Sequence, residues 1–200
     1  MAATDDARTT QPHLATDAAA LRPLLAATPA LATASPWNDQ ASLLHAAAKA
    51  GAADVVRLLL EAGAHAALAD EDGQTALHHA ASEGHLDCVV ELAQRPTCDE
   101  LLVEDQVQMT PYHLACENGH EGVVAHLLGL LEAQAATDRD TEVRIEKVRR
   151  GSALFLAKER GHGAIVELIE RATPRTTSSG SSSSRSEAPT AGATAPTQGA

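Results

Sequence analysis

Ten histidines and three cysteines are the side chains of this 200-residue chain best suited to chemistry. Both types bind zinc, and histidine also transfers protons near neutral pH. Six of the histidines recur at two positions of a repeated pattern: His45, His78 and His113 at one, and His85, His120 and His162 at the other. Copies of one position lie a whole repeat apart, which favours a structural role over ligands around one metal. We therefore expect no metal site and no cofactor.

The cysteines give no stronger sign of chemistry. Three is an odd number, and their spacing is not that of a disulfide framework. Cys88 and Cys116 fall on helix positions that face neighbouring elements, so we interpret them as core thiols. Cys98 falls in a loop, where we expect it to be exposed, but no residue near it in sequence would activate the thiol.

Catalytic motifs are absent from the sequence. There is no glycine-rich phosphate loop, no nucleophile elbow and no His-Glu-x-x-His zinc motif. The acidic runs at 70–72, 99–100 and 104–105 lack the alternating oxygen spacing of a calcium loop, and we interpret them as solvated surface. We therefore expect a protein that is not an enzyme.

One sequence motif recurs along the chain, and the elements that it forms must position these side chains. It reads Thr-Pro-Tyr-His-Leu-Ala at 110–115, and it returns at 75–80, at 42–47 and, more faintly, at 152–157. The first residues of successive copies are 33, 35 and 42 positions apart, and a glycine follows each copy. Four phased copies indicate one helical unit stacked on itself.

These copies resemble the ankyrin family, whose signature is Thr-Pro-Leu-His-x-Ala on a period of about 33 residues. The resemblance covers roughly residues 37–172. It implies an all-α ankyrin-repeat α-solenoid, in which helix-turn-helix units stack and hairpin-like fingers project between them. It also implies that the signature histidine ties adjacent fingers together by hydrogen bonds.

The domain organisation follows from this phasing. We expect a leader at 1–36, a repeat domain at 37–172 and a disordered Ser/Thr/Ala/Pro-rich tail at 173–200. The repeats would span 37–69, 70–104, 105–146 with an insertion at 135–150, and 147–172. Residues 17–27 would form either a capping helix, with Pro23 near its first turn, or part of a disordered leader. The insertion would be either an extended finger or a helix.

Several residues depart from the repeat pattern. Gln108 replaces the turn glycine found at Gly73, which predicts a differently shaped finger. Glu91 and His126 stand where apolar residues are expected, which predicts a wetter or looser outer layer. Phe155 replaces the signature histidine in the fourth copy, as suits a divergent terminal repeat.

Charge indicates the class of partner. The net charge is -12, and residues 37–134 hold 16 acids against three bases. Such a body disfavours nucleic acid and favours a basic or mixed-charge protein. No apolar run is long enough to span a bilayer, and Leu21 is followed at once by Arg22 and Pro23, which interrupts any secretory core. We expect a monomer with reduced thiols in the cytoplasm, with the nucleus left open.

The resemblance also implies which residues bind the partner, because ankyrin proteins use finger tips and the exposed side of the inner helices. Among them, Val107 with Met109 is the best apolar centre. Carried over position by position, the set is Asp39, Ala41, Lys49, Glu71, Asp72, Gln74, Ser82, Glu83, Gln106, Val107, Met109, Glu117 and Asn118.

The resulting hypothesis is a non-catalytic protein-binding module, an adaptor, assembly chaperone or inhibitor with an acidic concave face. The alternative is a regulatory subunit or fragment of an enzyme whose catalytic part lies elsewhere.

Overall fold

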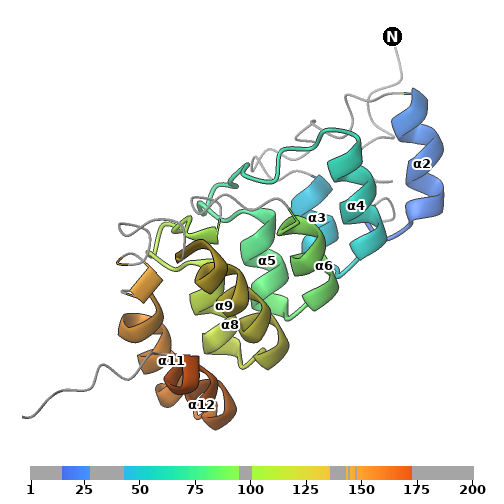
Figure 1. Cartoon of the computed structure of the whole chain (residues 1–200). Helices are drawn as coiled ribbons and strands as arrows, with labels where there is room; N and C mark the ends of the chain where they lie inside the picture. Colours follow the sequence, from blue (N-terminus) through green and yellow to red (C-terminus); the bar gives the residue numbers. More distant parts are fainter. Residues whose placement is uncertain are drawn as a thin grey trace, which may run out of the picture.

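The computed structural model describes residues 15–27, 43–94, 101–135, 143, 145–146 and 148–172. These residues form two rows of helices that run side by side along the molecule (Figure 1). The inner row consists of α3 (Leu43–Lys49), α5 (Ala76–Glu83), α8 (Pro111–Asn118) and α11 (Leu154–Glu159). The outer row consists of α2 (Ala18–Ala27), α4 (Ala53–Glu61), α6 (Leu86–Leu92), α9 (Glu121–Ala135) and α12 (Gly163–Ala172).

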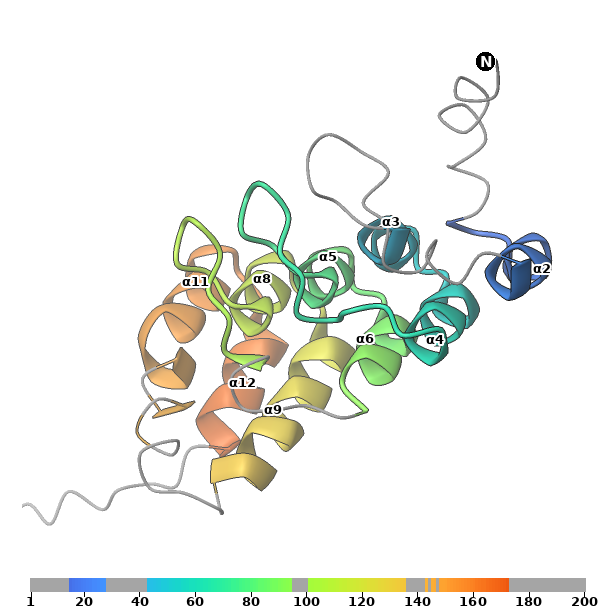
Figure 2. The same cartoon turned by 90° about the horizontal axis from the view of Figure 1, so that it is seen from above.

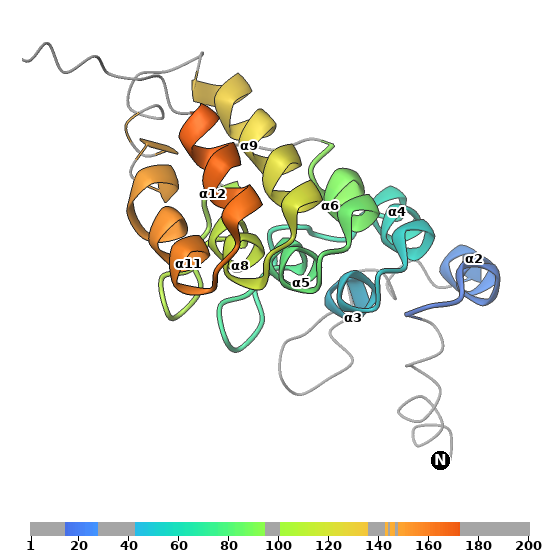
Figure 3. The same cartoon turned by 90° about the horizontal axis from the view of Figure 1, so that it is seen from below.

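Each helix packs on the next member of its own row. The inner helices stack in the order α3, α5, α8 and α11, and the outer ones in the order α2, α4, α6, α9 and α12 (Figures 2 and 3). In the described residues, extended pairing is limited to one bridge between Ala69 and Thr75. The predicted all-α solenoid is therefore confirmed. None of the described helices is long and apolar enough to cross a membrane.

The inner helices begin and end where the repeated sequence motif predicts. Thr75 and Thr110 are the N-caps of α5 and α8, and each forms a capping box with the histidine three residues later. Pro111 occupies the first turn of α8, where its missing N–H costs no hydrogen bond. Gly84 and Gly119 end these helices in the left-handed conformation, with φ of 79° and 83°.

The core is built from small and aliphatic side chains at equivalent positions of successive repeats. Alanines at 47, 48, 80, 81 and 115 are fully buried, which lets the inner helices approach closely. Leu44, Leu77 and Tyr112 fill one equivalent position of the first three repeats, and all three are buried. Thin layers of this kind bury their apolar surface only against neighbouring repeats, which explains why so few aromatic residues suffice.

In the described part of the chain, two hairpin fingers project beside the inner row, and their backbones match (Figure 2). In the first, Asp70 N–H donates to Gln74 O at 2.9 Å; in the second, Asp105 N–H donates to Met109 O at 2.9 Å. Gln108 adopts φ of 62°, close to the 76° of Gly73. The predicted difference in shape is therefore wrong: Gln108 accepts the left-handed conformation because the Asp105 carboxylate holds the turn, accepting from Val107 and Met109 N–H groups.

Replacing Gln108 by glycine is expected to stabilise the protein by about 0.5–1 kcal/mol. A side chain in the left-handed region costs about 1–2 kcal/mol, and the greater freedom of glycine in the unfolded chain takes back part of that gain. Chemical denaturation would measure the change. The control is Val107→Gly, one position earlier and without positive φ. If both glycine variants moved the midpoint in the same direction, the strain at Gln108 would not exist.

The fourth repeat begins with helix instead of a third finger. The described residues among 143–148 are helical, and the chain continues through the π-helix η2 (Arg149–Ala153) into α11. Of the two alternatives for the insertion, an extended finger or a helix, these residues adopt the helix. Ser152, the counterpart of Thr110, consequently lies inside η2 and does not cap a helix start.

The fourth repeat carries polar residues at positions that the third repeat buries. Where the third repeat buries Cys116 and Leu128, the fourth carries Lys158 and Glu170, whose Nζ and Oε1 atoms lie 3.2 Å apart. Phe155, in the place of the signature histidine, is 62% exposed. Residues 173–200, the predicted tail, lie outside the described residues.

At the other end, α2 joins the outer row. Asp17 Oδ1 accepts from Ala19 and Ala20 N–H groups, so it caps the helix, and Leu21 and Leu25 are buried. α2 packs against α4. Pro23 lies at the sixth position of the helix, so its expected place near the first turn is wrong. Capping of the solenoid by this half-repeat stays a prediction.

Candidate functional site

The signature histidines form a ladder between repeats, as predicted. His78 Nδ1 accepts from Thr75 N–H at 3.1 Å, which leaves the proton on Nε2 to be donated to Met109 O at 3.2 Å. His45 Nε2 likewise donates to Leu68 O and Gln74 O, at 3.0 and 3.2 Å. Each ring therefore joins the start of an inner helix to the base of the following finger.

The third signature histidine, His113, has a different hydrogen-bond acceptor. His113 Nδ1 accepts from Thr110 N–H at 3.1 Å, so Nε2–H donates, and it donates to Ser152 Oγ. The fourth repeat thus supplies a hydroxyl to this histidine, which also has a hydrogen bond with the backbone of Val148. Burial lowers the pKa of His45, His78 and His113 below the ordinary value for histidine, so all three are neutral at pH 7.

A second ladder follows the inner helices. The Nε2 atoms of His85, His120 and His162 lie 3.1, 2.8 and 2.9 Å from the carbonyl oxygens of Lys49, Ser82 and Glu117, each one repeat earlier. Six of the ten histidines therefore hold the repeats together. Among the described residues, no group of three or more His, Cys, Asp or Glu side chains could hold a metal ion.

The two described cysteines of the core are inert. Cys88 and Cys116 are fully buried, and this burial raises the pKa of the thiols to about 11 and about 12. Their interpretation as core thiols is confirmed. Cys98 lies outside the described residues.

The acids of the first finger divide into structural and exposed residues. Asp70 Oδ1 accepts from the N–H groups of Asp72 and Gln74 at 3.0 and 2.8 Å, and Oδ2 lies 2.8 Å from His79 Nε2. Burial opposes ionisation of Asp70, but the hydrogen bond from His79 and those from the backbone outweigh it, so its pKa lies below the usual value. Asp70 thus belongs to the fold, while Glu71 and Asp72 are exposed at the tip.

The second finger is bound to the first. Gln106 N–H donates to Asp72 O at 3.1 Å, and the Gln106 side chain donates to Glu71 O. Gln74 Nε2 donates to Asp105 Oδ2 at 3.3 Å. The neighbouring Val107 is 73% exposed, the largest exposure of any large apolar side chain described. Glu71, Asp72 and Val107 therefore share one rigid, double-finger edge, with Met109 half-buried at its base.

The expected site residues at the ends of the inner helices are mostly occupied by contacts between repeats. Asn118 Nδ2 donates to Ser82 O and Ser82 Oγ, at 3.0 and 3.1 Å. Glu117 forms an ion pair with Arg160. Lys49 and Glu83 are exposed.

The sequence interpretation missed Arg160, although its position is signalled by the spacing. Arg160 follows Asn118 by the same 42 residues that separate the third and fourth copies of the sequence motif. It brings a positive charge to the ends of the inner helices, next to Glu117. Asp39 and Ala41, also expected at the site, lie outside the described residues.

Comparison with known proteins agrees with this architecture. A family model that describes three copies of the ankyrin repeat matches residues 15–101 and 44–140. The matched region begins near α2 and ends before the fourth repeat. No curated protein sequence matches the chain.

Proposed function

Since the chain belongs to the ankyrin-repeat family, a group of protein-interaction modules, we propose that it binds a basic or mixed-charge protein without catalysing a reaction. The observation that carries the proposal is the finger edge, defined as Glu71, Asp72 and Val107. All three side chains are exposed, and the described hydrogen bonds of the fold do not use the two carboxylates.

The chemistry of this edge suits a cationic surface that also presents an apolar group. Two carboxylates at one finger tip attract lysine or arginine, while Val107 offers the apolar contact that an interface needs near its centre. The bonds from Gln106 to the first finger fix the two tips relative to each other, so little conformational entropy is lost on binding. Glu83 extends the same charge along the inner row, where Lys49 is the cation of the first repeat.

The cellular role that follows is that of an adaptor, assembly chaperone or inhibitor, acting as a monomer in the cytoplasm or the nucleus. These roles share one physical requirement, a protein partner held at the finger edge. The proposal is therefore tested at that edge and not through any one of the roles.

Replacing Glu71 and Asp72 by serine is expected to weaken partner binding at least tenfold at low salt while the melting temperature stays unchanged. Exposed carboxylates add steering and modest affinity, and salt screens both. Affinity capture from the native lysate would supply the partner, and titration at low and high salt would measure the loss. Asp70 must stay intact, because it holds the finger together.

The matched control removes two exposed acids from the outer row, Glu121 and Glu167, so the net charge changes equally. We expect this variant to bind as the unmodified protein does. Equal weakening by both variants would reduce the effect to net charge, and unchanged binding by the finger variant would place the interface elsewhere.

A further inference from the structure

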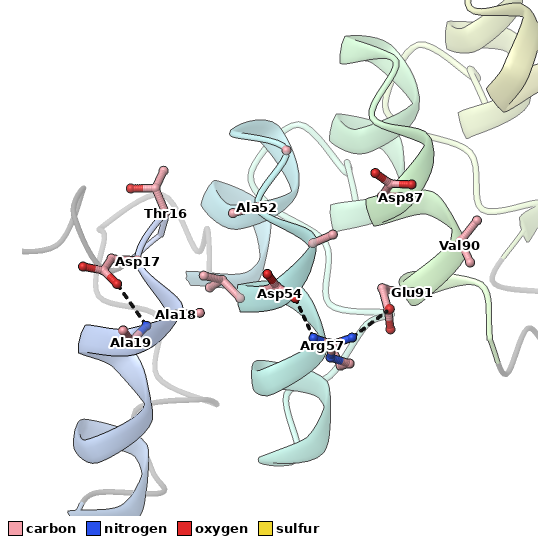
Figure 4. Close-up of a pocket in the computed structure, with 13 residues that line it drawn as sticks. Thr16, Asp17, Ala18, Ala19, Ala52, Asp54, Arg57, Asp87, Val90 and Glu91 are labelled. Atoms are coloured by element: carbon pink, nitrogen blue, oxygen red, sulfur yellow. Dashed lines mark hydrogen bonds and ion pairs between the residues drawn. The ribbon is translucent and has the colours of Figure 1, made fainter.

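The seam between α4 and α6 on the outer row is interrupted by a charged pair. Glu91 occupies the position at which the first repeat has Leu58, which is only 8% exposed. Glu91 instead extends across the seam, where Oε1 lies 3.8 Å from Arg57 Nη1 (Figure 4). Gln94 Nε2 donates to the other carboxylate oxygen, Oε2, at 2.7 Å. Arg57 also pairs with Asp54.

Hollows lie on both sides of this pair. Their position agrees with the wetter or looser outer layer that was predicted at Glu91. One, of about 670 Å³, is lined by the start of α2 and by residues of α4 and α6 (Figure 4). The other, of about 360 Å³, is lined by residues further along α4 and α6, including Leu60 and Leu92. Both are lined by Arg57 and Glu91, so they form one depression crossed by the pair. We name this depression the outer furrow.

The outer furrow is negatively charged. Its lining holds one cation, Arg57, against five acids: Asp17, Asp54, Glu61, Asp87 and Glu91. The positive ends of α2, α4 and α6 also lie there, and each contributes roughly half a charge at most. Three such ends, about 1.5 charges together, do not neutralise the net negative charge of these side chains. Arg57 itself is already held by Asp54 and Glu91.

An apolar stripe borders this charge. Leu86 and Val90 are 39% and 37% exposed and lie four residues apart, hence on one face of α6. Leu86 faces Gly122 of the next outer helix, whose missing side chain leaves the leucine uncovered. At the position of Val90, the neighbouring repeats carry Arg57 and Ala125, so the stripe is particular to the second repeat.

We propose that the outer furrow is a second docking surface, which takes a cationic amphipathic segment of a protein partner. Lysine or arginine side chains of the segment pair with Asp54 and Asp87, and its apolar side chains cover Leu86 and Val90. The long contact between Arg57 and Glu91 opens to admit a further cation to Glu91. The outer row lies opposite the fingers, so the outer furrow and the finger edge are separately accessible (Figure 2).

The test uses a synthetic 14-residue peptide with lysine and leucine at helical spacing, titrated into the isotopically labelled full chain at 150 mM salt. Amide shifts are expected to concentrate at residues 17–19, 54–57 and 86–91. Asp87→Lys and Val90→Ser are each expected to weaken binding of the peptide at least fivefold. The melting temperature of each variant should stay within 2 °C of that of the unmodified protein. A peptide with glutamate in place of lysine should not bind.

Glu121→Lys is the matched control, since Glu121 is an exposed acid in the first turn of α9, outside the outer furrow. It should change peptide affinity less than twofold. The proposal is overturned if Glu121→Lys weakens binding as much as Asp87→Lys, or if the shifts concentrate at the finger edge. Neither result would affect the finger edge proposed above, which rests on other residues.

Discussion

Replacing Gly84 by valine should destabilise the protein by about 2–5 kcal/mol. Gly84 ends α5 with φ of 79°, a conformation that costs an ordinary residue about 1–2 kcal/mol and a β-branched one more. A Cβ added there would also lie closer than 3.0 Å to three atoms of the His120 ring. Displacing that ring breaks its hydrogen bond to Ser82 O, and overpacking adds about 1–3 kcal/mol.

Gly63→Val separates the two contributions. Gly63 also has positive φ, 92°, but nothing lies within 4 Å of a Cβ placed on it. It should therefore show the backbone cost alone. Chemical denaturation of both variants measures the difference, which belongs to the contact with His120. Equal losses in the two variants would mean that the second histidine ladder does not require glycine, and no loss in either would invalidate the phasing of the repeats.

Acid should destabilise the protein before its carboxylates are protonated. His45, His78 and His113 have pKa values lowered by burial, whereas in the unfolded chain they titrate near 6.5. The unfolded state therefore binds more protons as pH falls. Stability is fully present above about pH 6.5 and is lost progressively below it, down to the folded pKa values. Protonation of His78 or His113 also removes the Nδ1 acceptor of a helix N-cap.

The pH dependence has a specific measurement. The urea midpoint should fall between pH 7.5 and pH 5.5, and His78→Asn should be less stable at both values but show a smaller difference between them. The lowered pKa of Asp70 adds a loss only at much more acidic pH, below the usual carboxyl range, so it does not mask the effect. A midpoint that stayed constant or rose on acidification would contradict neutral, buried histidines.

Residues with local signals were predictable from the sequence, and those that depend on neighbouring repeats were not. Thr75, Thr110 and Gly84 act within one helical turn, so their roles follow from a few adjacent residues. Gln108 was misjudged because a carboxylate three residues earlier stabilises the turn that glycine usually allows. Ser152 was aligned correctly with Thr110 by spacing, yet the preceding residues form a helix and change its role.

The candidate site shows the same limit. Spacing placed Gln106, Ser82 and Asn118 on the exposed side of the repeats, but their side chains donate to or accept from the repeat beside them. Glu71, Asp72 and Val107 were placed equally well, and they remain exposed. Whether an exposed position is hydrogen-bonded within the protein depends on a residue about 35 positions away in the neighbouring repeat. The pattern within one repeat does not contain that information.

Hydrogen exchange of the full chain, free and bound to its captured partner, tests the central claim most directly. We expect slower exchange in the complex at residues 71–73 and 106–109, with residues of α9 and α12 unchanged. Loss of this protection in the Glu71→Ser, Asp72→Ser variant would assign it to the two carboxylates. Protection confined to the outer row, with both fingers exchanging as in the free protein, would contradict the finger edge as the binding surface.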